Sequence, residues 1–226
     1  MGADEEGRIT MSTFLGSFTF MRDQLSLLLD KTGQHIWMCA VVVAVSLVVA
    51  VPLGLWLGHL HKGEFLTSAI SNIGRALPNL AVIAIGLGIF GLTFTNIAIA
   101  LLITAIPPIL SQAYLAVDQV DPDLVRSARG MGLTPAQVLF KVELPLALPL
   151  LFSGVRIAVV YVISSATLAT VAGGGGLGDI VLGQATYGLE GVIAAALWVA
   201  VLALAADGAL ALLQRVLVPK GLRAAR

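Results

Sequence analysis

Residues 36–58 read IWMCAVVVAVSLVVAVPLGLWLG, a stretch without a single charged side chain. A helix needs about 20 residues to cross the hydrocarbon core of a bilayer. Backbone amides without hydrogen-bond partners are costly in lipid, so an apolar stretch of this length is expected to be helical. The stretch therefore predicts a transmembrane helix and places much of the chain in a membrane.

The composition of the whole chain agrees with this prediction. Hydrophobic residues make up 58% of the 226 residues and charged residues only 12%, and the mean hydropathy is +0.97. The chain begins with acidic residues and lacks the basic start of a cleaved signal peptide, so no cleavage is expected. Its net charge of zero gives no reason to expect a nucleic-acid partner. The single cysteine, Cys39, is expected to pack as a small apolar residue.

Four more spans are predicted after the first, which makes an all-α protein with five transmembrane helices. They run from Ser68 to the turn at residues 91–95 with a kink at Pro78, from that turn to Asp118, from Pro145 to about Val171, and from Gly191 to about Gln214. Residues 9–31 mix apolar and charged side chains and predict an interfacial helix. The predicted organisation is an N-terminal extracytoplasmic or interfacial segment (1–35), a transmembrane domain (36–217) and a tail (218–226).

The basic residues indicate the orientation of these spans. Residues 59–62, residues 118–141 and the tail with Arg215, Lys220, Arg223 and Arg226 all fall on one side of the five-span arrangement. Loops rich in lysine and arginine stay in the cytoplasm. We therefore expect the N-terminus outside and the C-terminus in the cytoplasm.

The segment between the third and fourth predicted spans, residues 118–149, reads DQVDPDLVRSARGMGLTPAQVLFKVELPLALP. Asp121 before Pro122 and Thr134 before Pro135 are each an N-cap followed by proline at the first helical position, which predicts two short helices. Each helix has an apolar face, formed by Leu124, Val125, Ala128 and Met131 in the first and by Val138, Leu139 and Val142 in the second. A plain connection needs only a few residues. We therefore interpret the segment as a surface for a partner, with a passive loop as the alternative.

The same segment resembles the EAA loop of ABC importer permeases. In that loop Glu-Ala-Ala is followed at fixed spacing by Gly and by an aliphatic-x-Leu-Pro sequence, which resembles Arg126-Ser127-Ala128, Gly132, and Val142 with Leu144-Pro145. The resemblance implies the type I ABC importer permease fold and a coupling segment, residues 118–144, that inserts into the ATPase subunit. Arg126 replaces the usual glutamate, which changes the expected charge of that contact. The implied coupling residues are Asp121, Pro122, Arg126, Ser127, Ala128, Gly132, Pro135, Val142, Leu144 and Pro145.

Three other stretches resemble the branch that imports glycine betaine, carnitine and choline. They are Val51-Pro52-Leu53-Gly54, residues 75–78 (RALP), and residues 166–170 (ATLAT) leading into Gly173 to Asp179. The methionine-importer permeases share the Gly-Gly-Leu-Gly sequence and remain the alternative. The resemblance implies a multi-pass subunit of a prokaryotic cytoplasmic membrane with three kinds of partner: an ABC ATPase, a second permease copy or paralogue, and an extracytoplasmic substrate-binding protein.

No phosphate-binding G-x-x-x-x-G-K-[ST] motif occurs in the chain. We therefore expect no catalytic residue and no bound cofactor here, with ATP and Mg²⁺ held by the partner ATPase. Gly173, Gly175 and Gly178 match G-x-G-x-x-G, but they follow a membrane span instead of a strand, so a dinucleotide site is not expected. His59 and His61 are interpreted as a surface pair, and no metal site is predicted.

Polar residues inside the spans supply the candidates for a solute pathway: Gln112, Tyr114, Ser164, Ser165 and Thr167, with Gly175 and Gly178 at its outer end. Small hydroxyl residues also mediate helix packing, which is the alternative. Arg156 and Asp207 are charges within spans and are predicted to form an ion pair, or else to reach the membrane surface separately. A secondary transporter or channel is a distant alternative, because five spans cannot form two equal inverted repeats.

Overall fold

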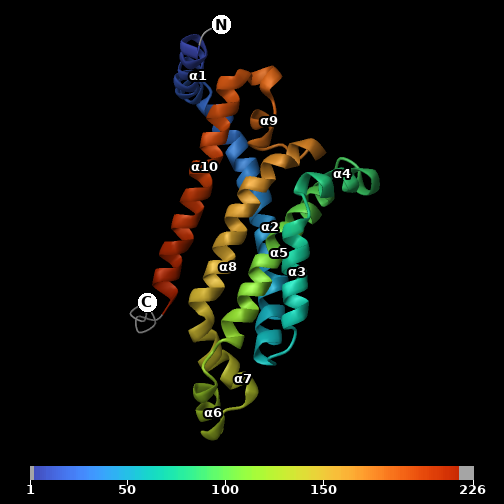
Figure 1. Ribbon diagram of the computed structural model, residues 1–226, viewed down its shortest axis with the longest axis vertical. Helices are drawn as coiled ribbons and strands as arrows, with labels where there is room; N and C mark the ends of the chain where they lie inside the picture. The colour runs from blue at the N-terminus through green and yellow to red at the C-terminus, as the bar shows by residue number, and fades with distance from the viewer. Residues whose placement is uncertain (1–2, 219–226) are drawn as a thin grey trace. The chain divides into compact units, whose positions relative to one another are not determined.

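The structure, a computed structural model, describes residues 3–218 and is helical throughout that range, with no strand among these residues (Figure 1). The predicted tail at residues 219–226 lies outside the described residues. The elements in chain order are α1 (Ala3–Asp23), α2 (Leu25–His59), α3 (Glu64–Ala76), α4 (Asn79–Phe90), α5 (Phe94–Asp118), α6 (Pro122–Gly130), α7 (Pro135–Val138), the π-helical turn η1 (Leu139–Glu143), α8 (Leu144–Ser165), the 3₁₀ helix η2 (Ala166–Ala172), α9 (Gly178–Val181) and α10 (Gln184–Leu217).

Four helical stretches of the described chain are long and apolar enough to cross a membrane: Leu25–His59, Phe94–Asp118, Pro135–Ala172 and Gln184–Leu217. The bent pair α3 and α4 makes a fifth if it is counted as one span. These helices confirm the prediction of an all-helical, multi-pass membrane protein. The bounds of several elements differ from those predicted.

The first span is longer than its apolar sequence. Helix α2 begins at Leu25 instead of Ile36, and the preceding helix α1 already ends at Asp23, so residues 25–31 do not belong to the N-terminal helix. The added turns include charged and polar residues that are held by side-chain contacts: Lys31 pairs with Asp179 at 2.7 Å, and the Trp198 indole donates to Thr32 Oγ1 at 2.9 Å. Hydropathy does not register such contacts.

The second predicted span is interrupted rather than kinked. Helix α3 ends at Ala76, Leu77 is extended with φ −79° and ψ 119°, and α4 begins at Asn79. Proline disfavours the helical conformation of the residue before it and cannot donate a backbone hydrogen bond. Pro78 therefore ends one helix and starts another.

The fourth span extends further towards the N-terminus than predicted. The second short helix of the coupling segment, α7, passes through η1 directly into α8, so Pro135–Ala172 is one helical stretch. The predicted separation of this short helix from the span starting at Pro145 is therefore wrong. In η1 the Leu144 N–H bonds to the Leu139 carbonyl, an i→i+5 bond typical of a π-turn. Helix α10 is also not uniform, because Gly188 has φ 67° and ψ 176° inside it.

The described chain forms two compact units. The first comprises residues 3–41, 79–101 and 162–204, and the second comprises residues 42–78, 102–161 and 205–218. In the first, the buried His35 Nε2 donates to the Ile163 carbonyl at 2.9 Å, and Asn96 Nδ2 donates to the Ile83 carbonyl at 3.2 Å. These bonds join α2 to α8 and α5 to α4.

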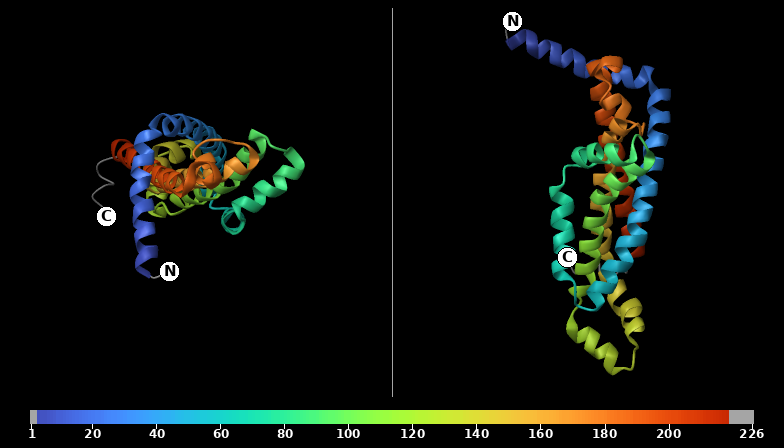
Figure 2. Two further views of the ribbon diagram at one scale, coloured as in Figure 1. Left: turned by 90° about the horizontal axis from the view of Figure 1, so that it is seen from above. Right: turned by 90° about the vertical axis from the view of Figure 1, so that its right-hand side faces the viewer.

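The core of the second unit joins α2, α5 and α8, which run side by side there (Figure 2). Its fully buried members are small or branched: Ala50, Ile109, Leu110 and Ala158. A Cβ atom on Gly54 would lie 2.9 Å from the Leu110 carbonyl oxygen, so α2 and α5 approach each other closely at this glycine. Close contact at small residues is how membrane helices gain packing energy without a hydrophobic driving force.

Candidate functional site

The first helix of the coupling segment, α6, is capped by residues at its own two ends. Asp121 Oδ1 accepts a hydrogen bond from the Asp123 N–H at 2.8 Å, and Pro122 occupies the first helical turn. Helix α6 ends at Gly130, and Gly132 follows with φ 84°, which favours glycine. Local chemistry alone therefore sets both ends of this helix.

The second short helix begins with a reciprocal cap. Thr134 Oγ1 accepts from the Gln137 N–H at 3.3 Å, and Gln137 Oε1 accepts from the Thr134 N–H at 2.9 Å. This capping box satisfies two backbone donors that a helix start would otherwise leave open. Pro135 occupies the first turn and is exposed.

The coupling segment has a small core of its own. Its buried side chains are Val125 and Ala128 of α6, Val138 of α7, and Val120, which precedes the cap of α6. Leu133, Val142 and Leu146 pack against these four side chains. Only part of each predicted apolar face is therefore used in this core, since Val125, Ala128 and Val138 are buried. The segment is a folded body and not a loose connection.

The remaining apolar side chains of the segment are exposed. Leu124 is 48% exposed, Phe140 62% and Met131 75%. We call these three residues the apolar face of the coupling segment. Exposed large apolar side chains on a folded segment are candidates for contact with a partner.

Arg126 and Ser127, which stand where the EAA sequence has Glu and Ala, are solvent-accessible. Ser127 is exposed, and Arg126 is exposed and pairs with Asp123 one turn earlier on α6. An exposed pair of this kind contributes little to stability. Both side chains therefore remain free to rearrange in contact with a partner. Leu144 and Pro145, at the end of the predicted sequence, are half-buried.

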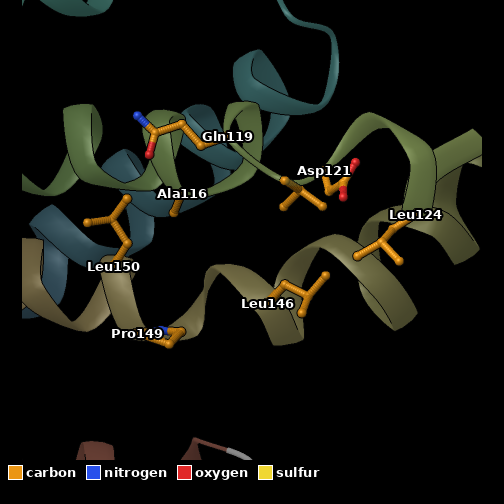
Figure 3. Close-up of a pocket in the computed structure, with 8 residues that line it drawn as sticks. Ala116, Gln119, Asp121, Leu124, Leu146, Pro149 and Leu150 are labelled. Atoms are coloured by element: carbon orange, nitrogen blue, oxygen red, sulfur yellow. The ribbon is translucent and has the colours of Figure 1, made fainter. Parts of the chain in front are cut away.

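A hollow of about 340 Å³ lies beside the apolar face, between the end of α5, the start of α6 and the first turns of α8 (Figure 3). Leu124 of α6 faces Leu146 of α8 across it (Figure 3). Asp121 and Gln119 supply its polar atoms, and the rest of its lining is apolar. Together, the hollow and Leu124 form a surface that can receive an apolar side chain.

Two histidines lie next to the coupling segment and form pairs that the sequence did not predict. His59 Nδ1 donates to Glu143 Oε2 at 2.6 Å, and only 11% of the His59 side chain is exposed. His61 Nδ1 donates to Asp118 Oδ1 at 2.9 Å. The interpretation of His59 as a surface residue is therefore wrong, because the carboxylate of Glu143 holds it inside. The sequence does hold one sign of such a partner: Glu143 is a single charged residue in the otherwise apolar sequence VELP.

The predicted pathway residues fall into both units. In the second, Tyr114 is buried, and Gln112 lies against Gly154 with its Oε1 lacking a hydrogen-bond partner among the described residues. In the first, Ser164 is exposed, Ser165 Oγ accepts from Asn79 Nδ2 at 2.7 Å, and Thr167 Oγ1 donates to the Ser164 carbonyl at 2.8 Å. Asn79, which follows the break at Pro78, is a polar neighbour that the pathway prediction omitted.

The glycine loop, residues 173–178, is held by a polar network. Asp179 accepts from Lys31 Nζ at 2.7 Å and from Thr170 Oγ1 at 2.8 Å, and the Gly176 N–H donates to Gln34 Oε1 at 3.3 Å. Gly178 is buried against the Thr167 carbonyl, where a Cβ atom would also lie 2.6 Å from Thr170 Oγ1. The glycines therefore serve a bend with close backbone contacts.

Replacing Gly175 with valine is expected to lower solute uptake about five- to thirtyfold, while association with the ATPase that the EAA-like sequence implies is retained. Gly175 has φ 68°, a conformation that a β-branched residue adopts only with strain, and its Cβ atom would meet Gln34 Oε1 at 3.1 Å. Uptake by membrane vesicles and copurification of the ATPase provide the two measurements. The control is Gly33→Val on α2, where a Cβ atom meets nothing within 4 Å; normal uptake by the Gly175 variant would contradict the prediction.

Arg156 and Asp207 form a bidentate ion pair. Arg156 Nε donates to Asp207 Oδ1 and Nη2 donates to Oδ2, each at 2.7 Å. About a third of each side chain is exposed, with 33% for the arginine and 32% for the aspartate. The pair joins α8 to α10 within two stretches that can cross a membrane.

These features define a multi-pass membrane protein that carries a folded segment with an exposed apolar face between two spans. Residues 50–219 match the family model of the binding-protein-dependent transport system inner membrane component. The chain belongs to this family. It is therefore a permease subunit, a multi-pass protein of the cytoplasmic membrane that acts in an ABC importer.

Relatives with assigned solutes cover almost the whole chain. It is 37% identical over 206 residues to the glycine betaine/carnitine/choline transport system permease protein OpuCB of Bacillus subtilis, covering 91% of this chain and 95% of that protein. It is 39% identical over 197 residues to the choline transport system permease protein OpuBB of the same organism, covering 87% and 91%.

It is also 35% identical to the osmoprotectant import permease protein OsmW of Salmonella typhimurium, covering 90% of this chain and 98% of that protein. A solved inward-facing structure of the MetNI methionine ABC transporter has the same fold. Its TM-score is 0.74 at 22% identity, and the match covers 87% of this chain and 99% of that chain.

Proposed function

We propose that this permease translocates a small quaternary-ammonium osmoprotectant of the glycine betaine, choline or carnitine type. The support comes from two relatives at 37% and 39% identity that are named for these solutes and a third at 35% that is named for osmoprotectant import, all matched over nearly their full length. The methionine importer is the second candidate, but its 22% identity speaks for the fold alone. Aromatic residues, which usually cage a quaternary ammonium, make up only 6% of the chain. Solute selection is therefore assigned to a separate binding protein, and the permease supplies a low-affinity route.

Energy for this transport is assigned to a partner ATPase that docks on the coupling segment. The support is the apolar face of Leu124, Met131 and Phe140, because these three apolar side chains are exposed on a segment that is folded and capped. The hollow beside Leu124 provides a matching recess. ATP and Mg²⁺ are held by the ATPase in this scheme, and two permeases are needed, since each of two ATPase subunits requires its own coupling segment.

The orientation that this scheme requires places the coupling segment in the cytoplasm and the N-terminus outside. ATPase closure then displaces the segment, the spans tilt, and solute passes between the two permeases. The outer end of the path is assigned to Gly175 and Gly178, with Ser164, Ser165 and Thr167 further along. The exposed Ser164 and the polar contact of Ser165 with Asn79 support this course.

Copurification and a ligand panel test the proposal in two steps. An affinity-tagged permease is expected to retain an ATP-binding subunit, which a secondary transporter or channel would not do. The substrate-binding protein that works with the permease is then tested by calorimetry against glycine betaine, choline, carnitine, proline and methionine. Tight binding of methionine alone would refute the osmoprotectant assignment while leaving the importer assignment intact.

A further inference from the structure

The last residue of α2, His59, and the turn that follows it contact the coupling segment near each of its ends. Asp118 is the last residue of α5, and Glu143 is the last residue of η1. His61 bonds to Asp118 and His59 bonds to Glu143, across 57 and 84 residues of sequence. Residues 59–61 therefore bond to both the first part of the segment, at Asp118, and its last part, at Glu143.

The exit contact is the more deeply buried of the two. Glu143 is 1% exposed, and its second oxygen, Oε1, has no hydrogen-bond partner among the described residues. An ionised carboxylate only accepts hydrogen bonds, so the Nδ1–H of His59 is the donor that stabilises it. Without this donor the buried carboxylate would have no partner, which is costly in a protein interior. Glu143 therefore depends on His59.

The turn that carries the histidines is fixed to α2. The His61 N–H bonds to the Gly58 carbonyl at 2.9 Å, and the Lys62 N–H bonds to the Leu57 carbonyl at 3.1 Å. His61 has φ 50°, an unusual conformation for a residue other than glycine. The histidines are thus attached to the end of a long helix, and they cannot follow the coupling segment without moving α2.

A pocket lies between this turn and the middle of the coupling segment. Its volume is about 510 Å³, and it is lined on one side by His59, Leu60 and His61 and on the segment by Arg129, Leu133 and Pro135. The two side-chain hydrogen bonds described above join His59 and His61 to the segment at its ends, at Glu143 and Asp118. A displacement of the segment pulls on both hydrogen bonds.

We propose that His59 and His61 are positioning residues that transmit movement of the coupling segment to α2. This inference rests on the proposed docking of an ATPase, and it adds a second route beside the direct continuation of the segment into α8. The histidines need not touch the ATPase or the solute. Their role is to make α2 move together with the segment, so that each ATP hydrolysed gives a full transport step.

The test measures the ratio of solute transported to ATP hydrolysed in proteoliposomes that contain the complete transporter, with radiolabelled glycine betaine as the probe. His59→Ala and His61→Ala are each expected to lower this ratio, by about tenfold for the buried pair, because a hydrogen bond to a charged group is lost. The conservative variants His59→Asn and His61→Asn are expected to restore the ratio, since the asparagine amide N–H can replace Nδ1–H. Lys62→Ala, an exposed residue of the same turn, is the matched control.

The outcomes separate this inference from the proposed function. If the wild-type transporter shows no ATP-driven uptake of any osmoprotectant, the proposed function fails. If the wild type transports and both alanine variants keep the wild-type ratio, the inference is overturned. The same conclusion follows if the asparagine variants behave like alanine. Should His59→Ala not assemble with the ATPase, the half-exposed His61 pair decides the question, because its loss leaves no buried charge.

Discussion

Replacing Met131 with glutamate is expected to reduce copurification of the ATPase by at least about tenfold and to abolish uptake. Met131 is 75% exposed, so the new charge costs the folded permease little. In the docked complex the same charge would be buried in an apolar contact without a partner, which is unfavourable. The measurement is the amount of ATPase retained per tagged permease, together with uptake by vesicles.

Two variants complete this experiment. Leu124→Glu should give the same loss, because Leu124 belongs to the same apolar face. Met131→Leu keeps an apolar side chain of similar volume and should retain the ATPase. Retention of the ATPase by both glutamate variants would show that the partner docks elsewhere.

Replacing Asp207 with asparagine is expected to destabilise the permease by about 2 to 3 kcal/mol, because it leaves Arg156 unpaired within a span. Asp207 now accepts two hydrogen bonds of 2.7 Å from the Arg156 guanidinium. Thermal unfolding of the detergent-solubilised protein provides the measurement. The expected change is a lower unfolding temperature with no change in solute preference.

Two double variants separate the stability that the ion pair contributes from the cost of leaving one of its charges unpaired. Arg156→Asp with Asp207→Arg should recover stability, since the charges are exchanged and the pair is kept. Arg156→Gln with Asp207→Asn should be less destabilised than Asp207→Asn alone, because no unpaired charge remains. If the exchanged variant is as unstable as the single variant, the interaction between the two helices contributes nothing measurable.

The sequence predicted those features that depend on local chemistry. The caps at Asp121 and Thr134 follow from residue type and spacing, and the structure has both. The long apolar runs likewise predicted helices that can cross a membrane. Within such runs an arginine and an aspartate are costly enough to suggest each other as partners, as with Arg156 and Asp207.

The remaining features depend on contacts between distant residues. The start of α2 at Leu25 is stabilised by partners such as Asp179 and Trp198, which no local window contains. His59 and Glu143 are 84 residues apart, so neither residue signals the other. The continuity of α7 with α8 runs through the π-turn η1, whereas Pro145, which removes a backbone donor and crowds the preceding turn, is in the sequence a signal for a helix start.

The π-turn at Leu139–Glu143 has a mechanical consequence. Within the second unit the helical stretch that begins at Pro135 continues through η1 into α8, so a displacement at its start is passed along residues 135–161. A π-turn holds one residue more than an α-turn, and each residue of an α-helix corresponds to about 100° of rotation about the axis. Tightening this single turn would exchange its i→i+5 bond for an i→i+4 bond and would therefore rotate the part of α8 that follows it in the second unit.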